Sequence, residues 1–132
     1  MERAHGECVA ERVRDALESL ARGGLTGIRH FATVIENGGT WLVSLLADGR
    51  CDPGKHFTVR MACTVQEERS LAAGLSLVRA TPLVVTLTRS SDGEQCAFQQ
   101  DLRLNPRSGA FRIDEAAVRS RFDEMLASLS LF

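Results

Sequence analysis

The residue types that most often carry chemistry in proteins are present here as three histidines and four cysteines. They are His5, His30, His56, Cys8, Cys51, Cys63 and Cys96. No two cysteines form a CxxC pair, and no two histidines have the HxxxH or HExxH spacing of metal ligands. Cys51, His56 and Cys63 offer a metal-binding set only if their loop folds back, and Cys63 alternates with Met61 and Val65, which predicts a core position. We therefore expect neither a metal nor a cofactor.

Nucleophilic and phosphate-binding motifs are equally scarce in the sequence. A cysteine hydrolase needs a thiolate beside a base, and none of the four thiols has a paired motif of that kind. The glycine pairs at 23–24 and 38–39 lack the GxGxxG and GxxxxGKS contexts, so they are predicted to form turns. A disulfide framework is allowed by the even number of cysteines, but we expect free and mostly buried thiols. The chain is therefore predicted to have no catalytic residues.

Length and charge set the broad class of the protein. The chain has 132 residues, of which 44% are hydrophobic, and this predicts a single domain over residues 1–132 with a disordered stretch at 1–6. The formal net charge of −1 removes the strongest electrostatic argument for nucleic acid or an anionic membrane as partner. No apolar run is long enough to cross a membrane, and four acidic residues within the first twenty argue against a secretory signal. A cytoplasmic location is expected.

Two amphipathic helices are predicted, one near each end of the chain. Apolar residues spaced for one helical face begin at Val9 and end at Leu20, and the helix is expected to stop at the glycine pair 23–24. In the second helix, Asp114 is the expected N-cap. Its apolar face is expected to consist of Val118, Phe122, Met125, Leu126 and Leu129.

The segment between the helices has the composition of strands and turns. Strands are predicted at 28–35, 40–46, 56–65, 83–89, 95–104 and 110–113, with a loop at 48–55. Asn37-Gly38-Gly39 favours a tight hairpin turn between the first two strands. Phe31, Phe57 and Phe98 each fit a core alternation. Residues 66–80 fit a strand as well as a helix, and the acidic residues at their start together with Pro82 favour a helix.

These elements predict an α+β fold, with a mostly antiparallel twisted sheet of five to six strands bracketed by N- and C-terminal amphipathic helices. The strand at 40–46 is apolar on both faces, because Trp41, Val43 and Leu45 alternate with Leu42 and Leu46. Helices cover one face, so the other is expected either to contact a partner or to lie in a sandwich-like core. The candidate partner-binding or dimer-binding residues are Trp41, Leu42, Val43, Leu45, Leu131 and Phe132.

The order of elements, with helices bracketing a twisted antiparallel sheet, resembles that of the class I type III secretion chaperones. The segment nearest in appearance is Leu102-Arg-Leu-Asn-Pro-Arg-Ser-Gly-Ala-Phe-Arg-Ile-Asp114, a strand, a Pro/Gly turn and a strand leading into the last helix. The resemblance covers most of the chain as topology and little of it as motif. It implies a homodimer that wraps an extended client segment around apolar grooves, without catalysis or nucleotide.

The sequence therefore favours a small non-enzymatic binding protein, a chaperone or adaptor that engages a segment of a partner protein as a homodimer. The alternative is a small-ligand-binding or enzymatic domain whose pocket lies between sheet and helices, with His30, His56 or a cysteine as its polar group. A subunit of a larger complex without independent activity fits the same sequence.

Overall fold

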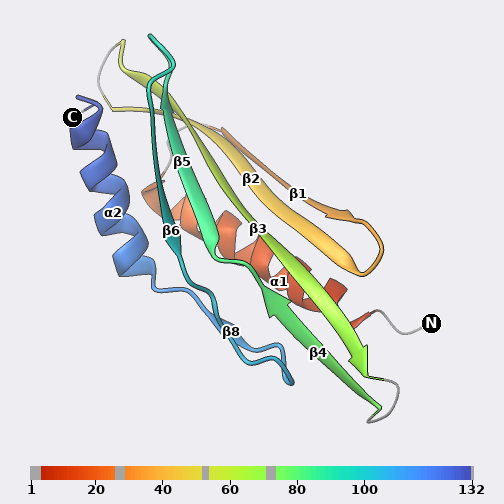
Figure 1. Ribbon diagram of the computed structural model, residues 1–132. Helices are drawn as coiled ribbons and strands as arrows, with labels where there is room; N and C mark the ends of the chain where they lie inside the picture. Colours follow the sequence, from red (N-terminus) through yellow and green to blue (C-terminus); the bar gives the residue numbers. More distant parts are fainter. Residues whose placement is uncertain (1–3, 26–28, 52–53, 71–73, 132) are drawn as a thin grey trace.

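The structure is a computed structural model that describes residues 4–25, 29–51, 54–70 and 74–131. It has an α+β fold, in which a helix at each end of the chain packs on an antiparallel sheet (Figure 1). The elements are α1 (His5–Leu20), the π-helical turn η1 (Ala21–Leu25), β1 (Arg29–Glu36), β2 (Thr40–Arg50), β3 (His56–Ser70), β4 (Leu75–Ala80), β5 (Leu83–Arg89), β6 (Gln95–Gln100), β7 (Arg103–Leu104), β8 (Phe111–Arg112) and α2 (Glu115–Ser128).

The main sheet has the order β1-β2-β3-β5-β6, and every described pairing in it is antiparallel. The fold class predicted from the sequence is confirmed. β3 is the longest strand and has two successive partners on one edge. Residues 57–62 pair with β5, and residues 65–70 pair with β4. β7 and β8 form a separate two-stranded ladder that leads into α2.

The predicted helix at 66–80 is wrong. β3 continues to Ser70 and β4 returns antiparallel to it, with residues 71–73 outside the described part of the chain. The carboxylate of Glu67, which favoured a first helical turn, instead accepts a hydrogen bond from the backbone N–H of Gly6 at 2.7 Å. Tertiary pairing along β3 and an acceptor for the start of α1 outweigh a local helix preference that was weak from the outset.

The strand ends also differ in detail from the prediction. β2 runs to Arg50, three residues into the expected loop, because the ring of Phe57 packs directly over Gly49, where a side chain would collide with it. β6 ends at Gln100, and Asp101 and Leu102 separate it from β7. The expected disorder at 1–6 does not hold for His5 and Gly6, which are already helical, while residues 1–3 lie outside the described range.

The hairpin between β1 and β2 has the turn that its sequence predicts. Asn37 and Thr40 exchange two backbone hydrogen bonds, at 2.8 and 3.3 Å. The two residues between them, Gly38 and Gly39, have φ values of 58° and 82°. Positive φ at both central positions defines a type I′ turn, whose twist matches that of the strands it joins.

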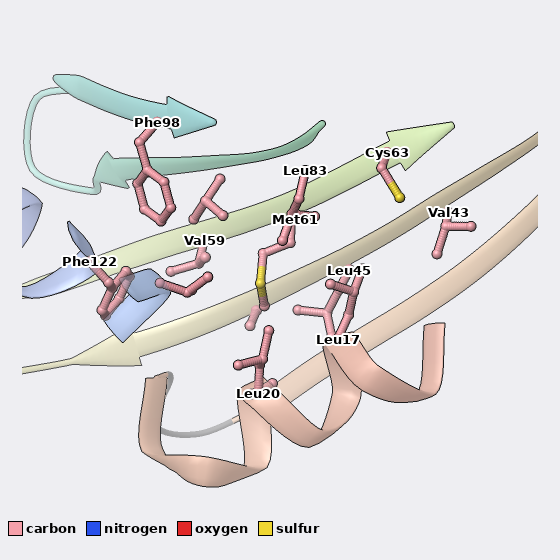
Figure 2. Packing of buried hydrophobic residues seen from close by; sticks show 14 of the residues in the cluster. Leu17, Leu20, Val43, Leu45, Val59, Met61, Cys63, Leu83, Phe98 and Phe122 are labelled. Atoms are coloured by element: carbon pink, nitrogen blue, oxygen red, sulfur yellow. The ribbon is translucent and has the colours of Figure 1, made fainter. Parts of the chain in front are cut away.

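One face of the sheet carries the hydrophobic core (Figure 2). Leu17 and Leu20 of α1 pack beneath Leu45 of β2 and Met61 of β3, as the close-up shows. The second helix, α2, lies alongside β6 (Figure 1).

α2 completes that core at the far end of the sheet. It is capped as expected, since Asp114 accepts a hydrogen bond from Ala117 N at 3.0 Å. Its Phe122 ring meets that of Phe57 edge-on, with centroids 6.0 Å apart. The apolar faces predicted for both helices are confirmed, since Val9 and Leu20 at the two ends of the first face are buried, as are all five residues predicted for the second. Ala16, which shares the helical spacing of the first face, is half-buried.

Candidate interaction surface

The face of the sheet opposite the helices is covered by no element of the described chain. We call it the open face. Strand register places on it the odd-numbered residues of β1 and β6 and the even-numbered residues of β2, β3 and β5. All five of the large apolar side chains that are exposed in the structure belong to it. They are Phe31 (69% exposed), Ile35 (57%), Leu46 (55%), Leu42 (37%) and Val84 (36%).

Four of these five side chains form a ridge along β1 and β2. Phe31 lies opposite Leu46, and Ile35 lies opposite Leu42, in direct cross-strand register. Between the two pairs, the hydroxyl oxygens of Thr33 and Ser44 lie 3.0 Å apart in a hydrogen bond. We call Phe31, Ile35, Leu42 and Leu46 the apolar ridge. Within each apolar pair the directly opposed side chains touch, so the ridge consists of two apolar pairs with one hydroxyl pair between them.

A hollow of about 390 Å³ lies beside the ridge, over β3 and β5. It forms where the partner of β3 changes from β5 to β4, because Thr81 and Pro82 interrupt the strand structure between β4 and β5. Two hydrogen bonds fix this interruption to β3. Thr81 N donates to Thr64 O (2.9 Å), and Thr64 N donates to Thr81 Oγ1 (2.8 Å). The lining residues include Leu42, Ala62, Thr64, Pro82, Val84 and Gln99. The hollow is lined mainly by small or apolar side chains.

Charge is sparse at the centre of the open face. Over the lengths at which β1, β2 and β3 pair with one another, the acidic residues and arginines on this face are Arg29, Asp48, Arg50 and Arg60, and of these Arg29 and Arg50 lie at strand ends. Neither Arg60 nor Asp48 has an ion-pair or hydrogen-bond partner through its side chain within the described ranges. The two lie diagonally on neighbouring strands, since Arg60 is opposite Leu46 and Asp48 is opposite Thr58.

The outer edge of β1 is a second available surface. No described strand pairs with that edge. Asn37 and Thr40 form a hydrogen-bonded pair at the turn. In an antiparallel ladder every second residue forms such a pair, so Ile35 and Thr33 also direct their N–H groups toward β2. The N–H groups of Ala32 and Val34 therefore point outward. An exposed edge of this length can pair with an extended segment of another chain.

The residues predicted from sequence as partner-binding fall into three places. Trp41, Val43 and Leu45 lie on the helix-covered face and are between 0% and 5% exposed, so in this conformation they contact the chain's own core. Leu42 is the predicted residue that the open face displays. Phe132 lies outside the described residues.

Leu131, which the sequence also offered as a partner-binding or dimer-binding residue, is 1% exposed and contacts the chain's own core in this conformation. After α2 the chain turns back at Ser130, whose φ is 56°, and Leu131 N bonds to Leu126 O at 2.8 Å. Arg89 donates to the carbonyl of Leu129 from the sheet. This turn directs Leu131 into the core.

Sequence reasoning missed Phe31, Ile35 and Val84 as surface residues. Phe31 in particular was assigned to the core, yet it is the most exposed large apolar side chain in the described structure. The information that places it is the register, because Phe31 pairs with Leu46 and is therefore on the opposite face from Leu45. A register fixed by the Gly38-Gly39 turn would have given this answer from the sequence.

The titratable candidates are not gathered into a site. Burial raises the pKa of the Cys63 thiol to about 11, so it is a thiol rather than a thiolate near neutral pH. Cys8, Cys51 and Cys96 are half-buried rather than buried. His30 Nε2 lies 3.9 Å from Glu18 Oε2, and His56 is exposed at the start of β3. Over the described ranges, no three His, Cys, Asp or Glu side chains are grouped as metal ligands.

Comparison of the chain with protein-family models, curated proteins and solved structures gives no match. None of the helices described here is both long and apolar enough to span a bilayer.

Proposed function

We propose that this chain is a small non-enzymatic binding protein, a chaperone or adaptor that acts as a homodimer and engages a segment of a partner protein. The observation that carries the proposal is the apolar ridge on a sheet face that the chain's own helices leave uncovered. Proteins that expose a contiguous apolar patch generally use it to bind another protein or a ligand. The topology that resembles the class I type III secretion chaperones supports the same class of function.

The partner segment binds at the outer edge of β1 by strand addition. The outward N–H groups of Ala32 and Val34 supply main-chain hydrogen bonds, and the neighbouring apolar side chains select alternate residues of the added strand. Such a partner is an extended segment with apolar residues at every second position. This mode requires a backbone edge and an apolar border, and β1 has both.

The experiment compares wild type and two variants as bait in the native host's extract, with bound proteins identified by mass spectrometry. In Ala32→Pro, the proline ring removes one outward N–H and leaves the bonds between β1 and β2 in place. Ala32→Ser is the matched control, because it changes the same side chain and keeps the N–H. A partner recovered by wild type and Ala32→Ser and lost from Ala32→Pro supports the proposal.

The recovered partner is then tested as a synthetic peptide, titrated by calorimetry against the same proteins. We expect the proline variant to weaken binding by about 100-fold, as expected when several main-chain bonds and the adjoining contacts are lost. Equal binding by Ala32→Pro and Ala32→Ser would contradict strand addition at β1. A purified wild type that turns over a small substrate without any protein partner would contradict the function itself.

A further inference from the structure

The apolar ridge and the hollow lie side by side on the same face, and they are of opposite shape. The ridge projects from β1 and β2, and the hollow is sunk over β3 and β5. A surface that carries both a projection and a matching recess is complementary to a copy of itself, provided that a two-fold axis relates the copies. The line between β2 and β3, where Ser44 lies opposite Ala62, runs between the two features, and Leu42 of the ridge also borders the hollow.

We propose that two copies of this chain pack open face to open face, with the apolar ridge of each seated in the hollow of the other. The inference rests on the proposed homodimer and specifies its interface. A two-fold axis along the strands, between β2 and β3, stacks β1 and β2 of one copy over β3 and β5 of its partner. The result is a four-layer assembly of helices, sheet, sheet and helices, in which two aligned sheets pack as in a β-sandwich.

The extent of the face matches what a stable dimer requires. Standard interfaces use about 20 to 30 residues and about 800 Å² on each side. The open face presents alternate residues of five strands, β1, β2, β3, β5 and β6, over their paired lengths. Its centre consists of Ser44, Ala62 and Thr64, which are small enough to let two sheets approach.

The sparse charges are arranged for the same pairing. A two-fold axis along the strands keeps each residue at its own level, so Arg60 on β3 of one copy lies over Leu46 on β2 of the other, one step along the same face from Asp48 and within reach of a long arginine side chain. Both side chains are without a partner inside the described protomer, and each copy supplies one of each sign. Two symmetric ion pairs therefore form across the interface, and they fix its orientation rather than its strength.

The test uses charge swaps between ridge and hollow, measured by sedimentation velocity at micromolar concentration. Wild type is expected near twice 14.4 kDa. Phe31→Glu puts a charge on the ridge and Val84→Lys puts one in the hollow, and each alone is expected to raise the dissociation constant by about 100-fold and give monomers. An equimolar mixture of the two variants is expected to return to the dimer mass. In that heterodimer one contact is Glu to Lys and the other is unchanged.

The reversed pair, Phe31→Lys with Val84→Glu, repeats the test if one of the first variants does not fold, and circular dichroism reports folding in each case. Glu124→Lys, on the exposed side of α2, is the control that leaves the dimer intact. Monomers in the mixture, or dimers of both single variants, overturn the ridge-in-hollow interface and leave the homodimer standing. A monomeric wild type across the whole concentration range overturns the homodimer as well.

Discussion

The two faces of the sheet are built from alternate residues of the same strands, yet they have opposite properties. On the covered face Val43, Leu45 and Met61 are fully buried beneath the helices. On the open face the neighbouring residues are mostly threonine, serine and charged or small side chains, with the apolar ridge at one side. Burial under the chain's own helices explains the first face completely. The ridge residues stay exposed and contribute little to the folding of one chain, which is why the proposed interface is placed on them.

The largest effect expected on the covered face is that of Phe122→Ala. The Phe122 ring packs against Phe57 in the core, and its removal leaves a cavity that costs about 3 to 5 kcal/mol of the free energy of unfolding. Urea denaturation followed by circular dichroism measures this loss. Glu124→Ala, on the exposed side of the same helix, is expected to change it by less than about 0.5 kcal/mol. Equal losses would mean that α2 presents a different side to the sheet.

A sharper form of the comparison uses two adjacent leucines of β2. Leu45 is fully buried and Leu46 is 55% exposed, so Leu45→Ala is expected to cost about 2 to 5 kcal/mol. Leu46→Ala is expected to cost less than about 1 kcal/mol for the isolated protomer. The measurement is urea denaturation at concentrations low enough to dissociate any dimer. Similar costs would contradict the assignment of the two faces.

Cys63→Ser introduces a polar group into the covered face without changing the size of the side chain much. We expect a loss of about 1 to 3 kcal/mol, because the hydroxyl loses its hydrogen bonds to water on burial. The same burial, which raises the pKa of the thiol to about 11, predicts slow labelling of Cys63 in the native protein at pH 8. Mass spectrometry of thiol-labelled peptides checks this, with the half-buried Cys96 as the internal control. Rapid labelling of Cys63 would place its side chain outside the core.

The smallest effect concerns Glu67, whose side chain is 6% exposed at the edge of the covered face. Burial raises the pKa of this carboxyl, but the hydrogen bond from Gly6 N and the contact with Arg69 outweigh burial and bring the pKa below its ordinary value. The ionised form therefore stabilises the fold above about pH 4.3, the ordinary glutamate pKa, and this contribution is lost as pH falls through the lower pKa of the folded state.

Glu67→Gln is expected to cost about 1 kcal/mol at pH 7, because it removes the negative charge at the start of α1. Urea denaturation at a series of pH values checks this. The difference between variant and wild type should shrink on acidification, since wild type alone loses the charge. A gap of constant size down to pH 2 would show that the carboxylate charge is not what stabilises the helix start.

Much of the fold follows from local patterns in the sequence. The apolar stripes of both helices, the Asp114 cap and the hairpin turn at Gly38-Gly39 depend on residues within one or two turns of each other. The structure of the segment 66–80 does not follow from local patterns, because Glu67 makes its decisive contact with Gly6, sixty-one residues away in the chain. The position of Leu131 likewise depends on a turn after α2 and on Arg89 in the sheet.

The candidate surface was predicted only in part, because it too depends on contacts between residues that are distant in the sequence. The sequence showed that one strand is apolar on both sides, but it did not say which side the helices would cover. That choice is made by packing, since Leu17 and Leu20 of α1 meet Leu45 and not Leu46. Phe31, which fits either face by composition, follows the register of its partner Leu46.

The position of α2 after all the strands in the sequence has a consequence for biosynthesis. Each strand of the main sheet after β1 can pair with an earlier strand as it leaves the ribosome, because β2 pairs with β1, β3 with β2, β4 and β5 with β3, and β6 with β5. The covered face of β5 and β6 has no such early partner. Phe57, Leu87 and Phe98 are in the same buried cluster as Phe122 and Leu131, which are synthesised later. The nascent sheet therefore exposes apolar surface on both sides until α2 packs on it, so the core over β5 and β6 is completed only after all the strands have been synthesised.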